Sequence, residues 1–255
     1  MKHKVELLAE RLTRILSAWD GVNCLLSCDA SETDVIDPYF ALVLDVYCDG
    51  PIPPIETRML AFENPGAFES SRSGQKDRFF LDGLPIHLEY KQTTDLTPLL
   101  DPGCDYQDFV PSSGTYYLYR IVEGTVLYSR GPWLETMRKT LLSLPDSFWQ
   151  ALRETCQFKM EHCLSDLGGA AFKADRYFFF VSLSGFLKAC AASIFALNRT
   201  WQPSNRHLTE ALLSLPLLPE DFSGRWEGLT RTDARIVPER IFQLAQLVAR
   251  SLFNL

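Results

Sequence analysis

The chain has 255 residues, of which 46% are hydrophobic and 22% are charged, and its formal net charge is -7. This length suits one large domain or two small ones, and the composition is ordinary for a soluble globular protein. The acidic balance argues against a general nucleic-acid surface. Seven cysteines without a CxxC pattern indicate reduced thiols and no zinc site. We therefore expect a cytoplasmic protein with no membrane partner.

The first element that the pattern predicts is an amphipathic helix over residues 4–19, followed by a short strand over residues 22–27. Ser27 then begins a small polar connection. If this connection opens a helix, its backbone N–H groups can hold phosphate. The same composition also fits a plain helix cap, so both interpretations of Ser27 remain open.

The run from Asp37 to Gly50 is apolar, β-branched and aromatic, with Asp45 inside it and Asp37 at its entrance. Such a run predicts a strand buried on both faces, where a charge is costly unless it is paired or holds a metal ion. Asp45 is therefore either a metal ligand in a phosphoryl-transfer site or the partner of a buried arginine.

Residues 64–76 are polar and are expected to form a loop, and a β-hairpin follows them. Its arms are residues 77–81 and 84–91, joined by the tight turn Asp82-Gly83. On the second arm His87 and Glu89 share a face that could meet Asp45 across the sheet. The alternative is that this face is simply the solvated side of an edge strand.

Long helical periodicity replaces strand patterning from about Thr115 onward, after which one strand-like piece stands at residues 125–128. Gly168-Gly169 is expected to break one of the long helices. The most apolar helix, residues 174–201, is apolar nearly all round, which predicts the buried centre of a bundle. The other expected helices cover residues 132–144, 146–167, 207–215, 220–229 and 238–253. The fold class is therefore α+β, a small mixed β-sheet domain followed by an all-helical bundle.

This order of parts resembles the nucleotidyltransferase superfamily with the DNA polymerase beta-like fold. Within it, the sequence looks most like the bacterial aminoglycoside and lincosamide nucleotidyltransferases and their uncharacterised relatives. The motifs that carry the resemblance are the interdomain join Ile121–Tyr128, the strand Leu88-Glu89-Tyr90, and the end of the long helix, Phe195–Arg199 with Pro203 and Arg206. The resemblance implies a nucleotidyltransferase-like domain over residues 1–115 and a helical substrate-binding domain over residues 116–255.

The chain departs from the first motif of that family. Its turn is Leu26-Ser27 without the family glycine, and no Asp-x-Asp pair stands on the following strand. The nearest acids are Asp37 and Asp45, with seven residues between them. The resemblance implies that Asp37, Asp45 and Glu89 hold Mg²⁺.

The resemblance also implies roles in binding and proton transfer. Ser27, Asn198, Arg199 and Arg206 would bind the co-substrate, ATP or another nucleoside triphosphate, and Asp175 would take the proton of a small acceptor hydroxyl. Structural alternatives stand beside these roles, because Asp175 also suits a helix N-terminus and the two arginines also suit a solvated helix end.

Three functions follow from the resemblance. The first is Mg²⁺-dependent transfer of a nucleoside monophosphate from a nucleoside triphosphate to an unidentified small acceptor. The second is a catalytically degenerate protein of this fold that binds a nucleotide or a protein partner. The third is a component of a two-protein toxin–antitoxin system, against which the fused helical domain argues.

Overall fold

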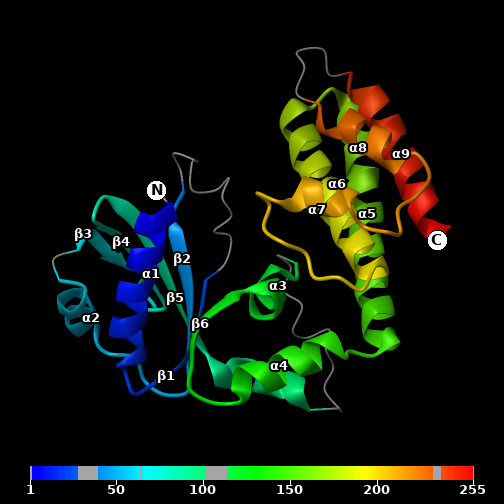
Figure 1. The fold of residues 1–255 in the computed structure, drawn as a ribbon. Coiled ribbons are helices and arrows are strands. Elements are labelled where there is room, and N and C mark those ends of the chain that lie inside the picture. Colours follow the sequence, from blue (N-terminus) through cyan, green and yellow to red (C-terminus); the bar gives the residue numbers. More distant parts are fainter. Residues whose placement is uncertain (1, 28–39, 64, 102–113, 232–236, 255) are drawn as a thin grey trace. The chain divides into compact units, whose positions relative to one another are not determined.

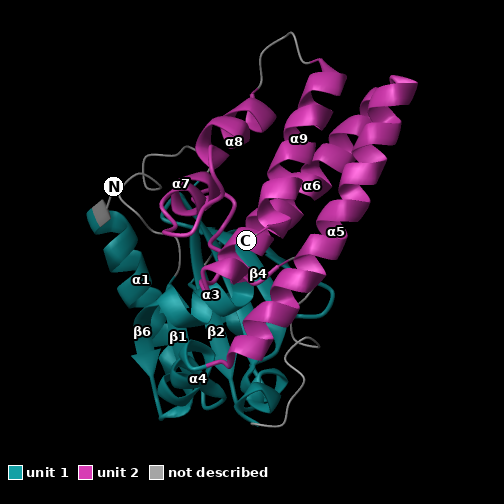
Figure 2. Ribbon diagram, turned by 90° about the vertical axis from the view of Figure 1, so that its right-hand side faces the viewer, with its two compact units in different colours: residues 1–105, 117–143 teal, residues 106–116, 144–255 magenta. Residues whose placement is uncertain are grey.

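A computed structural model describes residues 2–27, 40–63, 65–101, 114–231 and 237–254. The chain forms two compact units, one of residues 1–105 and 117–143 and the other of residues 106–116 and 144–255 (Figure 2). The first contains a mixed sheet and the second contains only helices among its described residues. The expected α+β fold class is confirmed.

The first unit is built on one six-stranded sheet with the order β3-β4-β5-β2-β1-β6 (Figure 1). Strands β2 and β5 run parallel, and all other neighbouring pairs are antiparallel. The strands are β1 (Val22–Ser27), β2 (Leu42–Cys48), β3 (Gly66–Ser70), β4 (Lys76–Leu81), β5 (Leu84–Gln92) and β6 (Thr125–Ser129).

One face of this sheet packs on the helix α1 (Lys2–Ser17). The helix buries four apolar side chains at spacings of three or four residues, Val5, Leu8, Leu12 and Leu16. They join the alternate side chains of β2 and β5 that point to the same face: Leu42, Leu44, Val46, Ile86, Leu88 and Tyr90. The intervening residues of both strands, Asp45 and Glu89 among them, therefore lie on the opposite face.

Short helices complete this unit: α2 (Ile55–Ala61), η2 (Thr93–Asp95), η3 (Thr97–Leu100), α3 (Tyr116–Glu123) and α4 (Trp133–Leu142). The expected hairpin turn is present, with positive φ at Asp82 (50°) and Gly83 (75°), as a type I′ turn requires. The loop expected over residues 64–76 is wrong, because β3 lies within it and pairs with β4.

The expectation of a single boundary between residues 115 and 116 stays a prediction; the two units exchange chain at residues 105/106, 116/117 and 143/144. Strand β6 pairs antiparallel with β1 and so closes one edge of the sheet. Residues 117–143, which include β6 and α4, consequently belong to the sheet unit. The strand itself was expected at residues 125–128, but its pairing with β1 was not, because the sequence pattern does not show which strands are neighbours.

The second unit is a bundle of α5 (Asp146–Lys173), α6 (Arg176–Leu197), α7 (Leu208–Leu213), α8 (Phe222–Thr230) and α9 (Pro238–Phe253). Gly168-Gly169 does not break a helix as expected, since α5 continues to Lys173. A Cβ on Gly168 would lie only 2.7 Å from Cζ of Phe242 on α9. The glycine therefore serves the close approach of two helices.

Helix α6 has the length and apolarity of a membrane span, and 56% of its most apolar window is buried inside the unit. The core helix of a bundle has the same features. The expectation of a helix buried all round holds only over residues 189–196, none of which is exposed. In the first turns Tyr177, Phe180 and Val181 are exposed.

Candidate functional site

The two acids expected to converge do lie side by side. Asp45 of β2 and Glu89 of β5 are register partners on neighbouring parallel strands. Both side chains point away from the α1 face of the sheet. Asp45 is fully buried, with 0% exposure, whereas the Glu89 side chain is 23% exposed.

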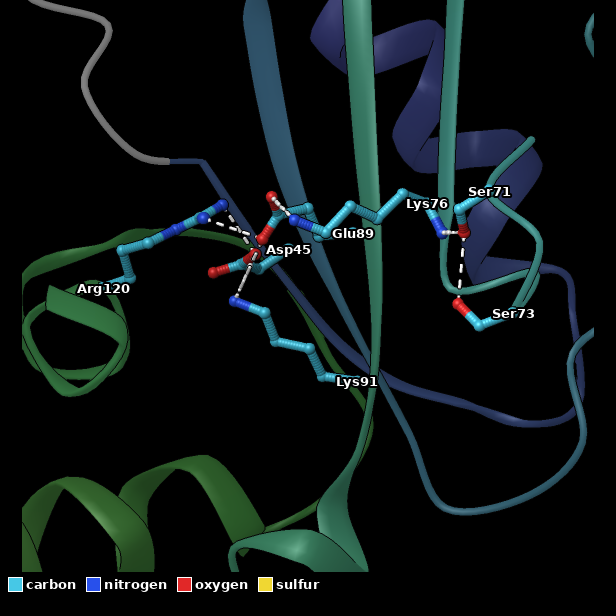
Figure 3. A network of polar contacts seen from close by, with 7 residues as sticks. All are labelled: Asp45, Ser71, Ser73, Lys76, Glu89, Lys91 and Arg120. Carbon is cyan, nitrogen blue, oxygen red and sulfur yellow. Dashed lines mark hydrogen bonds and ion pairs between the residues drawn. The ribbon is translucent and has the colours of Figure 1, made fainter. Parts of the chain in front are cut away.

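Three basic side chains surround this pair of acids (Figure 3). Lys91 Nζ and Arg120 Nη2 each lie 2.6 Å from Oδ1 of Asp45. Arg120 Nη1 donates to Oε2 of Glu89 at 3.0 Å, and Lys76 Nζ donates to Oε1 of Glu89 at 2.9 Å. We call these five residues, Asp45, Lys76, Glu89, Lys91 and Arg120, the charge cluster.

The three basic residues of the charge cluster belong to three different elements of the fold, β5, β4 and α3. Lys91 stands two positions after Glu89 on β5 and so shares its face. Lys76 of β4 is the register partner of Glu89 in the antiparallel pair. Arg120 comes from α3, far along the chain, and is itself buried.

Burial and the neighbouring charges shift the pKa values of both acids. Burial raises the pKa of Asp45, and the positive charges of Lys91 and Arg120 only partly oppose this rise. Burial also acts to raise the pKa of Glu89, but Arg120, Lys76 and Lys91 outweigh it and lower the pKa to about 2. Glu89 is therefore ionised at neutral pH and forms ion pairs with Arg120 and Lys76.

The described residues of the charge cluster do not fit a Mg²⁺ ion. Mg²⁺ takes oxygen ligands at about 2.0–2.1 Å, and here ammonium and guanidinium groups lie against the carboxylate oxygens. Among the described residues, no group of three or more His, Cys, Asp or Glu is placed to hold a metal ion. Asp37, the third expected ligand, lies outside the described residues.

The other expected site residues of the two units have local structural roles. Ser27 ends β1, opposite Leu44 of β2, one position beyond the pair Leu26 and Asp45. Asp175 is the N-cap of α6, where its Oδ1 accepts a hydrogen bond from the backbone N of Phe178 at 3.0 Å. This is the helix-terminus role that stood beside the expected proton transfer.

Three of the four expected nucleotide-binding residues, Asn198, Arg199 and Arg206, follow the opposite end of α6. Asn198 is the C-cap, and it exchanges two hydrogen bonds of 2.9 Å with the backbone of Leu217. Arg199 pairs with Asp146 at 2.9 Å in an exposed position, and Arg206 is exposed. Helix α6 has 22 residues and is about 33 Å long, so Asp175 and Asn198 cannot contact one small ligand.

Sequence reasoning missed Lys76, Lys91 and Arg120. The spacing from Glu89 to Lys91 was the available signal, since residues two apart on a strand share a face. Lys76 could follow only from the register of the hairpin. Arg120 has no local signal, because its place depends on where α3 meets the sheet.

The geometry defines an α+β protein whose mixed sheet carries two adjacent acids, neutralised by three basic side chains. No family model and no curated protein matches the sequence. Among solved structures, the fold is similar to a nucleotidyltransferase-like protein from Exiguobacterium sibiricum, with 13% identity and a TM-score of 0.48. The likeness covers 95% of this chain and 72% of that chain. It is not a likeness to the antibiotic nucleotidyltransferases in particular, and at this TM-score it does not establish an activity.

Proposed function

We propose that the first unit binds the phosphate groups of a nucleotide, ATP or another nucleoside triphosphate, at the charge cluster without catalysing Mg²⁺-dependent transfer. This is the degenerate form of the function that the sequence resemblance implies. One observation carries the proposal. The fully buried Asp45 has both Lys91 and Arg120 at 2.6 Å, so the acid expected to hold the metal is already paired with an arginine.

The balance of charge favours an anion over a second cation. The charge cluster contains two acids and three bases, so one positive charge is in surplus. Two like unit charges 4 Å apart repel by about 4 kcal/mol at the effective dielectric constant of a protein surface. A divalent cation beside Lys91 and Arg120 would meet this repulsion, whereas a phosphate group would meet attraction.

The basic side chains also reach solvent, as a binding site requires. The Lys76 side chain is 53% exposed and the Lys91 side chain is 24% exposed. Both amines therefore remain accessible to a ligand while Arg120 stays buried between the two acids. Ammonium groups contact phosphate as compact point charges.

Calorimetric titration of the full chain with ATP, once with Mg²⁺ and once with EDTA, tests the proposal. We expect binding in EDTA at least as tight as binding with Mg²⁺, because free ATP carries more negative charge than its magnesium complex. Binding that requires Mg²⁺ contradicts the proposal.

The second proposal is Mg²⁺-dependent transfer of a nucleoside monophosphate to a small acceptor, as in the antibiotic nucleotidyltransferases that the sequence resembles. The register pairing of Asp45 with Glu89 favours it, since adjacent acids on neighbouring strands are what that resemblance implies. It requires Lys91 and Arg120 to leave Asp45. The same titration decides, because only this proposal predicts that ATP binding is lost in EDTA.

A further inference from the structure

The helical unit contains a cavity of about 520 Å³ between α5, α6 and the segment that follows α6. This volume lies within the range of about 300–1,000 Å³ that is typical of small-molecule sites. The described residues that line the cavity all belong to the second unit. Its apolar walls include Phe148 and Leu152 of α5 and Phe195 of α6.

The sequence of α6 explains why the cavity is open. Four small residues line it at spacings of four, three and four positions, Gly185, Ala189, Ala192 and Ala196. Such spacing places them on one face of the helix. A Cβ on Gly185 would lie 2.7 Å from Sγ of Cys163, so the two helices are in close contact beside the cavity. Beyond this contact, toward the C-terminal end of α6, the three alanines are too small to fill the space between the helices.

The lining contains basic but no acidic side chains among the described residues. The basic ones are Lys159 and His162 of α5 and Lys188 of α6. Lys159 stands four positions before Cys163, and Lys188 stands three positions after Gly185. The helices α5 and α6 form a helical hairpin and so run antiparallel. One turn back along α5 from Cys163 and one turn forward along α6 from Gly185 therefore lead in the same direction, and both lysines lie at the same height along the two helices.

The two lysines are available to a ligand. Within the described part of the chain, neither Lys159 nor Lys188 forms an ion pair with a carboxylate, whereas His162 lies 3.6 Å from Asp166. Neutral polar side chains also line the cavity, and Gln202 is one of them. Gln202 is 9% exposed and is positioned by the hydrogen bond from its backbone N to Oγ1 of Thr115 at 3.1 Å.

We propose that this cavity binds a small molecule that joins an apolar body to one anionic group. The body lies against the alanine face of α6 and against Phe148, and the anion lies between Lys159 and Lys188. The proposal does not depend on the charge cluster of the first unit. The same charges disfavour a polycationic ligand.

Three probes that share one ring system but differ in charge (an anion, a neutral molecule and a cation) test this proposal on the full chain. They are naphthalene-2-sulfonate, 2-naphthylmethanol and 2-naphthylmethylammonium, titrated by calorimetry. We expect the sulfonate to bind about tenfold more tightly than the ammonium probe, with the alcohol between them. Equal affinities for the sulfonate and the ammonium probe, or no binding of any probe at millimolar concentration, would overturn the proposal.

Two sets of variants locate the binding. In the double variant Lys159→Gln/Lys188→Gln the preference for the anion should disappear while the alcohol still binds. The double variant Lys173→Gln/Arg176→Gln removes the same two positive charges at exposed positions outside the cavity and is the matched control. A preference that survives in Lys159→Gln/Lys188→Gln overturns the assignment of the anion to these lysines.

Ala192→Phe fills the cavity and should weaken the binding of all three probes. Ser184→Phe adds the same ring at an exposed position of α6 outside the cavity and should not. If Ala192→Phe is folded by circular dichroism and still binds the sulfonate as tightly as the original chain, the probe occupies another place and the proposal fails.

Discussion

Asp77 and Asp45 are both fully buried on one sheet, but their surroundings differ on its two faces. Asp77 of β4 faces the α1 side, where Arg58 of α2 holds both of its oxygens at 2.9 and 3.0 Å. The hydroxyl of Tyr90 also donates to Asp77, at 2.8 Å. Asp45 faces the other side, where both close cations lie against Oδ1.

The Arg58–Asp77 pair is closed and matched in charge. The Arg58 side chain is only 2% exposed, lies over the ring of Tyr90, and donates to Oγ of Ser70 and the carbonyl of Pro53. One acid meets one base, and solvent does not reach either of them. A matched pair of this kind has no surplus charge to offer a ligand, so its role is to hold α2 against β4.

The charge cluster is unmatched and partly open. It has one base more than it has acids, and Lys76 extends into solvent. Oδ2 of Asp45 accepts no hydrogen bond from the residues that the structure describes. Burial alone therefore does not distinguish these two acids. The balance of charge around the acid, and the access of solvent to that charge, distinguish the two.

Arg58→Met should give the largest effect, because it leaves the carboxylate of Asp77 buried without a partner. We expect a loss of about 3–5 kcal/mol in the free energy of unfolding, measured in urea. The control is Arg78→Met, on the exposed face of β4 next to Asp77. It should change the free energy of unfolding by less than about 0.5 kcal/mol. A loss below about 1 kcal/mol for Arg58→Met would contradict the view that the matched pair stabilises the fold.

Asp45→Asn should destabilise the first unit by a smaller amount, about 2 kcal/mol, since Lys91 and Arg120 lose their carboxylate partner but the burial that raises the pKa of Asp45 offsets part of this loss. The loss is smaller because the partly exposed amine of Lys91 can turn to water. The measurement is again urea unfolding. If Asp45→Asn lowers the free energy of unfolding as much as Arg58→Met does, solvent has no access to the charge cluster and the contrast between the two sites is wrong.

The stability contributed by Glu89 should depend on pH in a defined window. Its pKa in the folded protein is about 2, below the ordinary value of 4.5. The folded state therefore binds the proton less readily than the unfolded state does, and the stabilisation is full above about 4.5. The difference in unfolding free energy between the original chain and Glu89→Gln, about 2 kcal/mol at neutral pH, should vanish as the pH falls from about 4.5 to 2. A difference that does not change over this range means that Glu89 is not held by the bases.

Lys76→Gln should give the smallest change in stability, within about 1 kcal/mol, because its ion pair with Glu89 is largely exposed. The same substitution should weaken ATP binding about two- to fivefold by removing the surplus charge. Lys139→Gln, on the exposed surface of α4, should change neither quantity. Equal ATP affinities for the two variants would place the nucleotide away from the charge cluster.

The local features of the fold were predictable because they depend on neighbours in the sequence. Alternation along β5 indicated a face that could bring Glu89 to Asp45 across the sheet, although a solvated edge-strand face stood beside it as the alternative. Asp82-Gly83 was enough to place the hairpin turn. What surrounds the acids was not predictable, since Arg120 comes from a helix far along the chain. Gly168 was misinterpreted for the same reason, because its purpose depends on Phe242 of α9.

Glu89→Gln separates the two proposed functions most directly, because they predict opposite changes. The substitution removes one acid, so the surplus positive charge of the cluster rises from one to two. Glu135→Gln, on the exposed surface of α4, is the control of equal charge change. In EDTA, with the folded state of each variant verified by circular dichroism, we predict that Glu89→Gln binds ATP several-fold more tightly than either the original chain or the control. ATP binding that is weaker in Glu89→Gln, or that depends on Mg²⁺ and is abolished by the substitution, would contradict nucleotide binding by the basic residues of the charge cluster.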